Sequence, residues 1–366
     1  MKYNLTHDEG KKKRTLYWNT CIVLGIIGII AFIVDANQDM NEARGEYVSV
    51  DNYQYYECSN GERIFDPDEV LENNGCDETS SNAVANTVCT AERDGSASHG
   101  LFRMPGYVKS LKSKKVNGNA NPTINNLTQN AIRVDGDYGF APVAINVGIP
   151  ALIEITKKHG IGVLTITNTH HFAALWPETE ALAEEDLVGI ACTAYKPSVA
   201  PAGAKKPLFG TNPISFAWPR PGKTPVVYDM ATASMAMGEV QVAMRDGHKV
   251  PMGTGLNKEG ELTSSPAEIV DGGMLLPFGG YKGSAISMMI ELLAAGMVGD
   301  LFSFEAKVED NNDGGPARGG EFIMAMSPEL IAGRNWADHS EEFLKQMLSL
   351  EAVSYTHLTL PTKRIV

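Results

Sequence analysis

The stretch RVDGDYGFAPVAINVGIPALIEITKKHGIGVLTITNTHHFAALWPETEALAEEDLVGIACTAY, residues 133–195, decides the predicted fold. Residues 133–137 are typical of a short strand, and residues 139–158 carry apolar side chains at helical spacing. The runs GIGVLTITNT and LVGIACTAY are each typical of a buried strand, and residues 179–185 between them are typical of a helix. This order predicts an α/β fold with a mostly parallel or mixed sheet.

Elements on either side extend this core into a region predicted to run from residue 67 to residue 352. Its first part, residues 67–130, is helical and includes two short amphipathic helices. The middle part, residues 131–300, contains the predicted sheet and a hydrophobic helix over residues 284–298. The last part, residues 301–352, returns through the strand GEFIMAMSP to a charged helix.

The N-terminal segment, residues 1–35, is predicted to be a membrane anchor or targeting segment. Four basic residues precede residues 15–34, which are long enough to cross a hydrocarbon core of roughly 30 Å. A cleaved signal and a buried core helix are the alternatives. We therefore expect the protein at a membrane or in an organelle, with the cytoplasm as the fallback. Residues 36–66 are interpreted as a polar spacer and residues 353–366 as a foreign tail.

The composition is that of a globular, acidic protein of 366 residues. A net charge of -13 argues against a nucleic-acid partner, because no basic stretch offsets phosphate repulsion. The five cysteines have no CxxC spacing, and no acid or cysteine beside His170-His171 completes a ligand set. The sequence therefore predicts no metal site.

Residues 96–103, SASHGLFR, place an imidazole and a guanidinium four residues apart. A helix that restarts near Ser98 puts His99 and Arg103 on one face. A proton donor then stands beside a group that holds a carboxylate through two hydrogen bonds. A structural histidine and a surface arginine give the same spacing, so the motif alone leaves both interpretations open.

No GxGxxG motif follows an early strand, so the usual dinucleotide fingerprint is absent. The nearest substitute is GGYKG, residues 279–283, where glycines let backbone amides approach a phosphate at a helix start; a tight turn is the alternative. Residues 171–175 follow a predicted strand, where ligands bind in α/β sheets. Asp229 and Glu239 are candidates to orient an imidazole, or else ordinary helix-end carboxylates.

Six blocks occur together in a characteristic order: AERDGSASHGLFRMPGY, DGDYGFAP, HHFAALWPE, KPLFGTNPISFAWPR, YDMATASMAMGE and LLPFGGYKGSAISMMIELLAAG. In order and spacing they resemble the malate/L-lactate dehydrogenase-like family of NAD(P)H-dependent oxidoreductases, over roughly residues 67–352. Within it, HFAALWPE and LLPFGGYKGSAISMM are most similar to the Δ1-piperideine-2-carboxylate/Δ1-pyrroline-2-carboxylate reductases.

The resemblance implies an α/β fold whose NAD(P)-binding domain is not a Rossmann domain, in a homodimer with its active site between domains. It implies His99 as proton donor, with Ser98 and Glu239 as its catalytic partners. It implies substrate contacts from Arg103, Thr211 and the position of Met237. The cofactor, NADPH or alternatively NADH, would contact His171, Phe172, Ala173, Ala174, Leu175, Asp229, Met230, Ala231, Tyr281 and Lys282.

Two residues depart from the imine reductase pattern. Met237 stands where those enzymes carry a histidine, and Glu239 stands where they carry an aspartate. Malate- and lactate-type members tend to carry a basic residue at the position of Glu239, so the acid favours the imine reductases.

We therefore expect reduction of cyclic imino-2-carboxylates to L-pipecolate or L-proline. A malate- or L-lactate-type 2-hydroxy-acid dehydrogenase is one alternative. The other, suggested by the hydrophobic segment and Met237, is a membrane-tethered protein that binds nucleotide without turnover.

Overall fold

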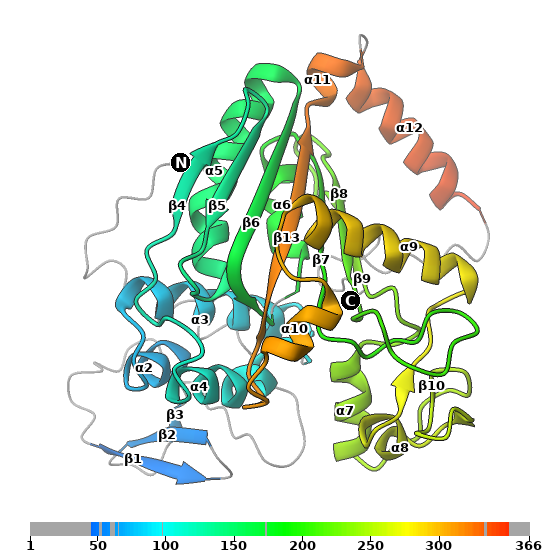
Figure 1. The fold of residues 1–366 in the computed structure, drawn as a ribbon. Helices are drawn as coiled ribbons and strands as arrows, with labels where there is room; N and C mark the ends of the chain where they lie inside the picture. The colour runs from blue at the N-terminus through cyan, green and yellow to red at the C-terminus, as the bar shows by residue number, and fades with distance from the viewer. Residues whose placement is uncertain are drawn as a thin grey trace.

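A seven-stranded mixed sheet forms the centre of the protein in the computed structural model (Figure 1). The structure describes residues 66–350 except 97, 173 and 333–334, together with the backbone of three short strands before them, β1 (Gly45–Val50), β2 (Tyr53–Cys58) and β3 (Arg63–Ile64). In spatial order, the central sheet consists of β4 (Thr123–Asn126), β5 (Ala131–Asp135), β6 (Ile161–His171), β13 (Ala317–Met326), β7 (Val188–Thr193), β8 (Ile214–Trp218) and β9 (Val226–Met230).

The prediction allowed a mostly parallel or a mixed sheet; the sheet is mixed, and a mostly parallel arrangement is wrong, because only the β5–β6 pair is parallel among the paired neighbours of this sheet. The local prediction of direction was right: β5, β6 and β7 all run the same way. Helix α6 (Trp176–Glu184) connects β6 to β7 but leaves a gap one strand wide. The late strand β13 fills that gap and pairs antiparallel with both neighbours.

Alternate residues of the central strands belong to different cores, because successive side chains of a strand point to opposite faces. Leu164 and Ile166 of β6, with Ile323 of β13, pack in a cluster that includes α5 (Ala141–His159) and α6. Phe322 of β13 packs in a second cluster with Ile290, from α9 (Tyr281–Glu291), and with the π-helix η3 (Leu292–Met297). Helices therefore cover both faces of the sheet.

Two smaller units flank the sheet (Figure 1). A helical unit with its own core, built around Tyr107 and Phe140, contains α2 (Pro67–Glu72), α3 (Glu78–Arg93), η2 (Leu101–Arg103) and α4 (Met104–Lys112). A second unit, packed around Val240 and Ile269, contains α7 (Met237–Arg245), β10 (Gly255–Leu256), β11 (Leu262–Thr263), α8 (Pro266–Val270) and β12 (Met274–Leu275). The chain ends its described part with α10 (Ser303–Glu309), α11 (Pro328–Ile331) and α12 (Trp336–Leu348).

Local sequence explains where these helices begin and end. The carboxylate of Asp77 accepts the backbone N–H of Ser80 at 2.7 Å and caps α3. Helix α5 starts with Pro142 in its first turn and stops at Gly160, whose φ of 86° suits glycine.

Among the residues that the structure describes, no helix is long and apolar enough to cross a bilayer, so the fold gives no support to the predicted membrane-spanning segment or to the membrane or organelle localisation based on it. Residues 15–34 themselves lie outside the described residues, as does the predicted tail over residues 353–366.

Candidate active site

The ends of five strands meet at one edge of the sheet and place the predicted site residues near one another. His171 ends β6 and pairs with Ala317 at the start of β13. Met230 ends β9 and pairs with Ile214 at the start of β8, which in turn pairs with Cys192 near the end of β7. In α/β folds, ligands bind at the carboxyl ends of strands, where the strand order changes direction.

His99 lies in a turn before η2 rather than inside a helix. Its Nδ1 contacts the hydroxyl of Ser98 at 3.0 Å, as the resemblance implies, and the hydroxyl of Ser96 at 3.2 Å. Burial, followed by the charges of Arg103 and His171, lowers the pKa of His99 to about 3. The ring is therefore held in place and neutral in the ligand-free protein.

Arg103 lies where η2 passes into α4, and its guanidinium is unusually free of charged partners. The group stacks over Phe172 at 5.0 Å and over Phe102 at 5.5 Å. Its Nε is buried without a hydrogen-bond partner, and none of the ion pairs in the described residues includes it. Burial lowers the pKa of Arg103. A half-buried guanidinium without an ionic partner is a ready site for a carboxylate.

The start of helix α7, which carries the last residues of the YDMATASMAMGE block, lies beside Arg103 and Ser98. A Cβ on Gly238 would lie 2.6 Å from Nη2 of Arg103 and 3.0 Å from the Cβ of Ser98. Met237 is half-buried beside it, against the core of the second flanking unit. The side chain of Glu239 is exposed, and the backbone N–H of Ala236 donates to it. The proposed catalytic role of Glu239 stays a prediction, because the hydrogen bonds to the ring of His99 come from serines.

The loop after β6 is fixed by a buried carboxylate. Oδ2 of Asp229 accepts the backbone N–H of Leu175 at 2.6 Å and that of Trp176 at 3.1 Å, at the start of α6. Burial raises the pKa of Asp229 to about 7. Leu175 and Ala174 are buried, whereas Phe172 is half-buried against the edge of Tyr107, and Ala173 lies outside the described residues. Asp229 therefore shapes the predicted cofactor loop from within the core.

Thr232 joins three of the sequence blocks. Its backbone N–H donates to the carbonyl of Thr211 at 2.9 Å, and its own carbonyl accepts the N–H of Phe278 at 3.0 Å. The first bond ties GTNP to the chain after Met230 and Ala231; the second leads into the glycine turn before α9. Thr211, Met230 and Ala231 are half-buried, and Tyr281 and Lys282 are exposed on the first turn of α9.

The first turn of α9 fits an anionic ligand. Gly279 and Gly280 have φ values of 56° and 62°, with open space where a Cβ would stand. Among the described side chains none caps this helix start, and exposed Lys282 stands beside it. The positive end of the helix dipole and an ammonium group are thus available to a phosphate.

A group of buried acids stands at the same edge and was missed by the sequence reasoning. His171, Glu178 and Glu321 come from β6, α6 and β13, and one side-chain donor atom from each lies within 4.8 Å of the others. All three side chains are buried. The HHFAALWPE block contains Glu178, but nothing in the sequence placed Glu321 beside it.

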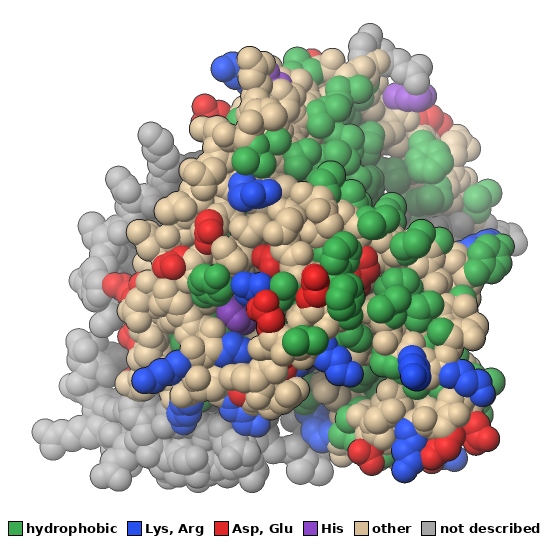
Figure 2. All heavy atoms as spheres, viewed as in Figure 1, with side chains coloured by type: hydrophobic (Ala, Val, Ile, Leu, Met, Phe, Trp, Pro, Cys, Tyr) green, Lys and Arg blue, Asp and Glu red, His purple; other side chains and the backbone are tan. Residues whose placement is uncertain are grey.

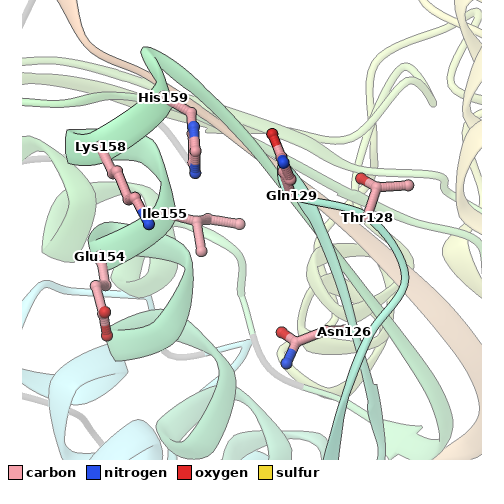
Figure 3. Close-up of a pocket in the computed structure, with 7 residues that line it drawn as sticks. All are labelled: Asn126, Thr128, Gln129, Glu154, Ile155, Lys158 and His159. Atoms are coloured by element: carbon pink, nitrogen blue, oxygen red, sulfur yellow. The ribbon is translucent and has the colours of Figure 1, made fainter.

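A separate pocket of about 260 Å³ lies at the other end of the sheet (Figure 3). Its lining comes from the last turns of α5, including Lys158 and His159, and from the β4–β5 turn at Thr128 and Gln129. Because β6 begins at this end and finishes at His171, the pocket lies away from the candidate site.

The family profile described as Malate/L-lactate dehydrogenase matches residues 67–364, and the chain belongs to this family. A Delta(1)-pyrroline-2-carboxylate/Delta(1)-piperideine-2-carboxylate reductase of Pseudomonas putida is 43% identical over 289 residues, which cover 79% of this chain and 84% of that protein. A reductase of the same name from Pseudomonas syringae pv. tomato is 44% identical over 264 residues, covering 72% of this chain and 77% of that protein.

A solved structure shows the same fold. The crystal structure of delta1-piperideine-2-carboxylate reductase from Pseudomonas syringae pv. tomato superposes with a TM-score of 0.75 at 41% identity, covering 78% of this chain and 86% of that chain. The family and these relatives make the chain an NAD(P)H-dependent oxidoreductase and confirm the family resemblance seen in the sequence.

Proposed function

We propose that the protein reduces the cyclic imines Δ1-piperideine-2-carboxylate and Δ1-pyrroline-2-carboxylate to L-pipecolate and L-proline. The observation that carries the proposal is the half-buried guanidinium of Arg103, whose buried Nε has no hydrogen-bond partner, beside the ring of His99. The names of relatives more than 40% identical support the choice of substrate. A small cyclic imine with a carboxylate next to its C=N bond fits this pair, because Arg103 can bind the carboxylate and His99 can protonate the imine nitrogen.

Arg103 binds the substrate carboxylate, and Phe172 holds the guanidinium plane by stacking. Ser98 and Ser96 fix the ring of His99 through Nδ1. Burial and then the charge of Arg103 lower the pKa of His99. The substrate carboxylate offsets the second of these causes, so substrate binding itself raises the affinity of the ring for a proton. His99 then gives that proton to the imine nitrogen as the C=N bond becomes C–N.

A nicotinamide cofactor, when bound, supplies the hydride to the imine carbon. The residues proposed to hold it are His171 to Leu175, Asp229 to Ala231, and Tyr281-Lys282. Asp229 acts by shaping the loop, because its carboxylate is already engaged by backbone N–H groups. We propose NADPH as the preferred cofactor, and exposed Lys282 at the start of α9 suits the extra phosphate.

Product analysis tests this assignment directly. With Δ1-piperideine-2-carboxylate and NADPH carrying deuterium at the transferred position of C4, NMR should show pipecolate with one deuterium at C2. Equal efficiency with NADH would contradict the cofactor preference. Absence of labelled pipecolate, together with reduction of pyruvate or oxaloacetate, would instead support a 2-hydroxy-acid dehydrogenase.

We also propose a homodimer, and the outer face of α9 and η3 supports it. Met288, Met289, Leu292 and Met297 are exposed there, with Leu292 at 55%. Figure 2 shows hydrophobic side chains gathered over the region where Figure 1 places α9. Exposed apolar patches of this kind mark interfaces between subunits.

Light scattering coupled to gel filtration checks the dimer. The wild-type protein should elute with twice the chain mass, and Leu292→Glu should shift it toward the monomer. A monomeric wild-type protein at assay concentration would refute the proposal.

A further inference from the structure

The buried group at the end of β6 has more polar atoms than partners. Nε2 of His171, Oε2 of Glu178 and both carboxylate oxygens of Glu321 are buried without a hydrogen bond among the described residues. Glu321 is 1% exposed, Glu178 3% and His171 6%. Buried polar atoms are normally paired, so the cluster requires an explanation.

The nearest pair in the cluster is an imidazole and a carboxyl group. Nε2 of His171 lies 3.6 Å from Oε2 of Glu321. This distance is slightly longer than a hydrogen bond, and a small movement of either side chain would close it. The ring is buried at the point where the loop to Phe172 begins. A partner for Nε2 would fix both the tautomer and the plane of this ring.

Protonation is the simplest way for these carboxyl groups to remain buried, because it removes their negative charge. Burial, then repulsion from Glu178 and Asp229, raises the pKa of Glu321 well above its usual value. Burial raises the pKa of Glu178 to about 8. Burial lowers the pKa of His171 to about 4. At neutral pH the ring is therefore neutral and the carboxyl pair retains a proton.

We propose that Glu321 is a positioning residue of the cofactor pocket, sharing a proton with Glu178 and accepting the Nε2–H of neutral His171. This inference rests on the proposed function, because it assigns the ring to the pocket that binds nicotinamide. Glu321 acts through His171 and touches neither the substrate nor the cofactor. The bond selects one tautomer and leaves Nδ1 without a proton.

The other titratable groups facing the cluster come from the neighbouring elements. Asp229 of β9 repels both glutamates, and Glu321 acts electrostatically on the thiol of Cys192 on β7. His99 interacts with His171 from the turn before η2. Loss of the shared proton at alkaline pH puts a negative charge beside the ring and should change its resonances.

The test is nitrogen NMR of the histidine side chains in the full-length, cofactor-free protein, with His171 assigned by its loss in His171→Gln. We expect a single Nε2–H tautomer at pH 7 and one alkaline transition. Glu321→Leu removes the acceptor and should yield a mixture of tautomers. Glu321→Gln keeps an acceptor oxygen, so the tautomer should persist while the alkaline transition is lost or moves by more than one pH unit.

Cofactor affinity gives a second readout. Quenching of protein fluorescence by NADPH should show about five- to tenfold weaker binding for Glu321→Leu, the loss expected for one hydrogen bond. Binding by Glu321→Gln should stay within twofold of wild type. Glu309→Gln removes an exposed carboxylate from α10 and is the matched control, with no expected change in either measurement.

Three results would overturn the proposal: the same His171 tautomer in Glu321→Leu as in wild type, an unchanged alkaline transition in Glu321→Gln, or one equivalent of tightly bound metal by mass spectrometry of the purified protein. If Glu321→Leu does not fold, the transition in Glu321→Gln decides alone. Failure of the proposed function is distinguishable, because imine turnover would then be absent while the His171–Glu321 coupling persisted in the cofactor-free protein.

Discussion

Gly238→Ala should damage substrate binding without unfolding the protein. The new Cβ would stand 2.6 Å from Nη2 of Arg103, 3.0 Å from the Cβ of Ser98 and 3.3 Å from its carbonyl oxygen. An ordinary contact needs about 3.5 Å, so the guanidinium must retreat by roughly 1 Å. The nearest atom, Nη2 of Arg103, is the far end of a flexible side chain and can move away. Alanine has a higher helix propensity than glycine, so the stability of α7 is preserved.

The binding free energy that is lost is that of the hydrogen bonds between Arg103 and the substrate carboxylate. A hydrogen bond to a charged group contributes about 1.5–3 kcal/mol, and a displacement of roughly 1 Å forfeits most of it. We therefore expect kcat/KM for the cyclic imine to fall by about 10- to 150-fold. Most of the loss should appear in KM, because the contacts with Ser98, the partner of His99, require a shift of only a few tenths of an ångström, whereas the contact with Nη2 of Arg103 is closer.

Steady-state kinetics and a thermal melt measure the two consequences separately. Met244→Ala, an exposed change on the same helix, is the control and should alter neither. Wild-type KM and kcat in a correctly folded Gly238→Ala variant would refute the placement of Arg103 in the substrate site. A collapse in melting temperature would show instead that the contact is structural.

Three further variants test other parts of the account. His99→Gln should reduce kcat by about 100-fold or more while cofactor binding stays within twofold, measured by rapid kinetics and fluorescence titration; undiminished kcat would exclude the proton-donor role. Arg103→Lys should raise KM more than tenfold, since an ammonium cannot form the paired hydrogen bonds, and an unchanged KM would contradict the clamp. Glu178, whose folded pKa is raised to about 8, contributes stability below its unfolded pKa that is lost as pH rises through 8. Glu178→Gln should therefore flatten the decline in melting temperature between pH 6 and 9; an unchanged slope would place the titration elsewhere.

The sequence predicted the elements of the core because their signals are local. The helices over residues 67–72 and 78–93 and the strand-helix alternation from β5 to β7 all occur where apolar spacing indicated them. Strand order was not local: β13 enters between β6 and β7 from more than 120 residues away. Strand β8 lies in a glycine- and proline-dense span that hid it.

The candidate site follows the same rule. Ser98, His99 and Arg103 are close in sequence, and the structure keeps them together with Gly238. The acids around His171 come from a helix and a distant strand, so no spacing rule could group them. Glu239 lies on the expected helix, but one turn of α7 decides which way its side chain points, and it is exposed.

The most direct test of the central claim compares substrates in one assay. The purified wild-type protein is supplied with NADPH and, separately, with Δ1-piperideine-2-carboxylate, Δ1-pyrroline-2-carboxylate, pyruvate and oxaloacetate, and kcat/KM is measured from NADPH oxidation. We predict that both cyclic imines exceed the open-chain oxo acids by at least about 100-fold, roughly the discrimination that about 3 kcal/mol provides. Turnover of the oxo acids alone, or of none of the four, would contradict the account.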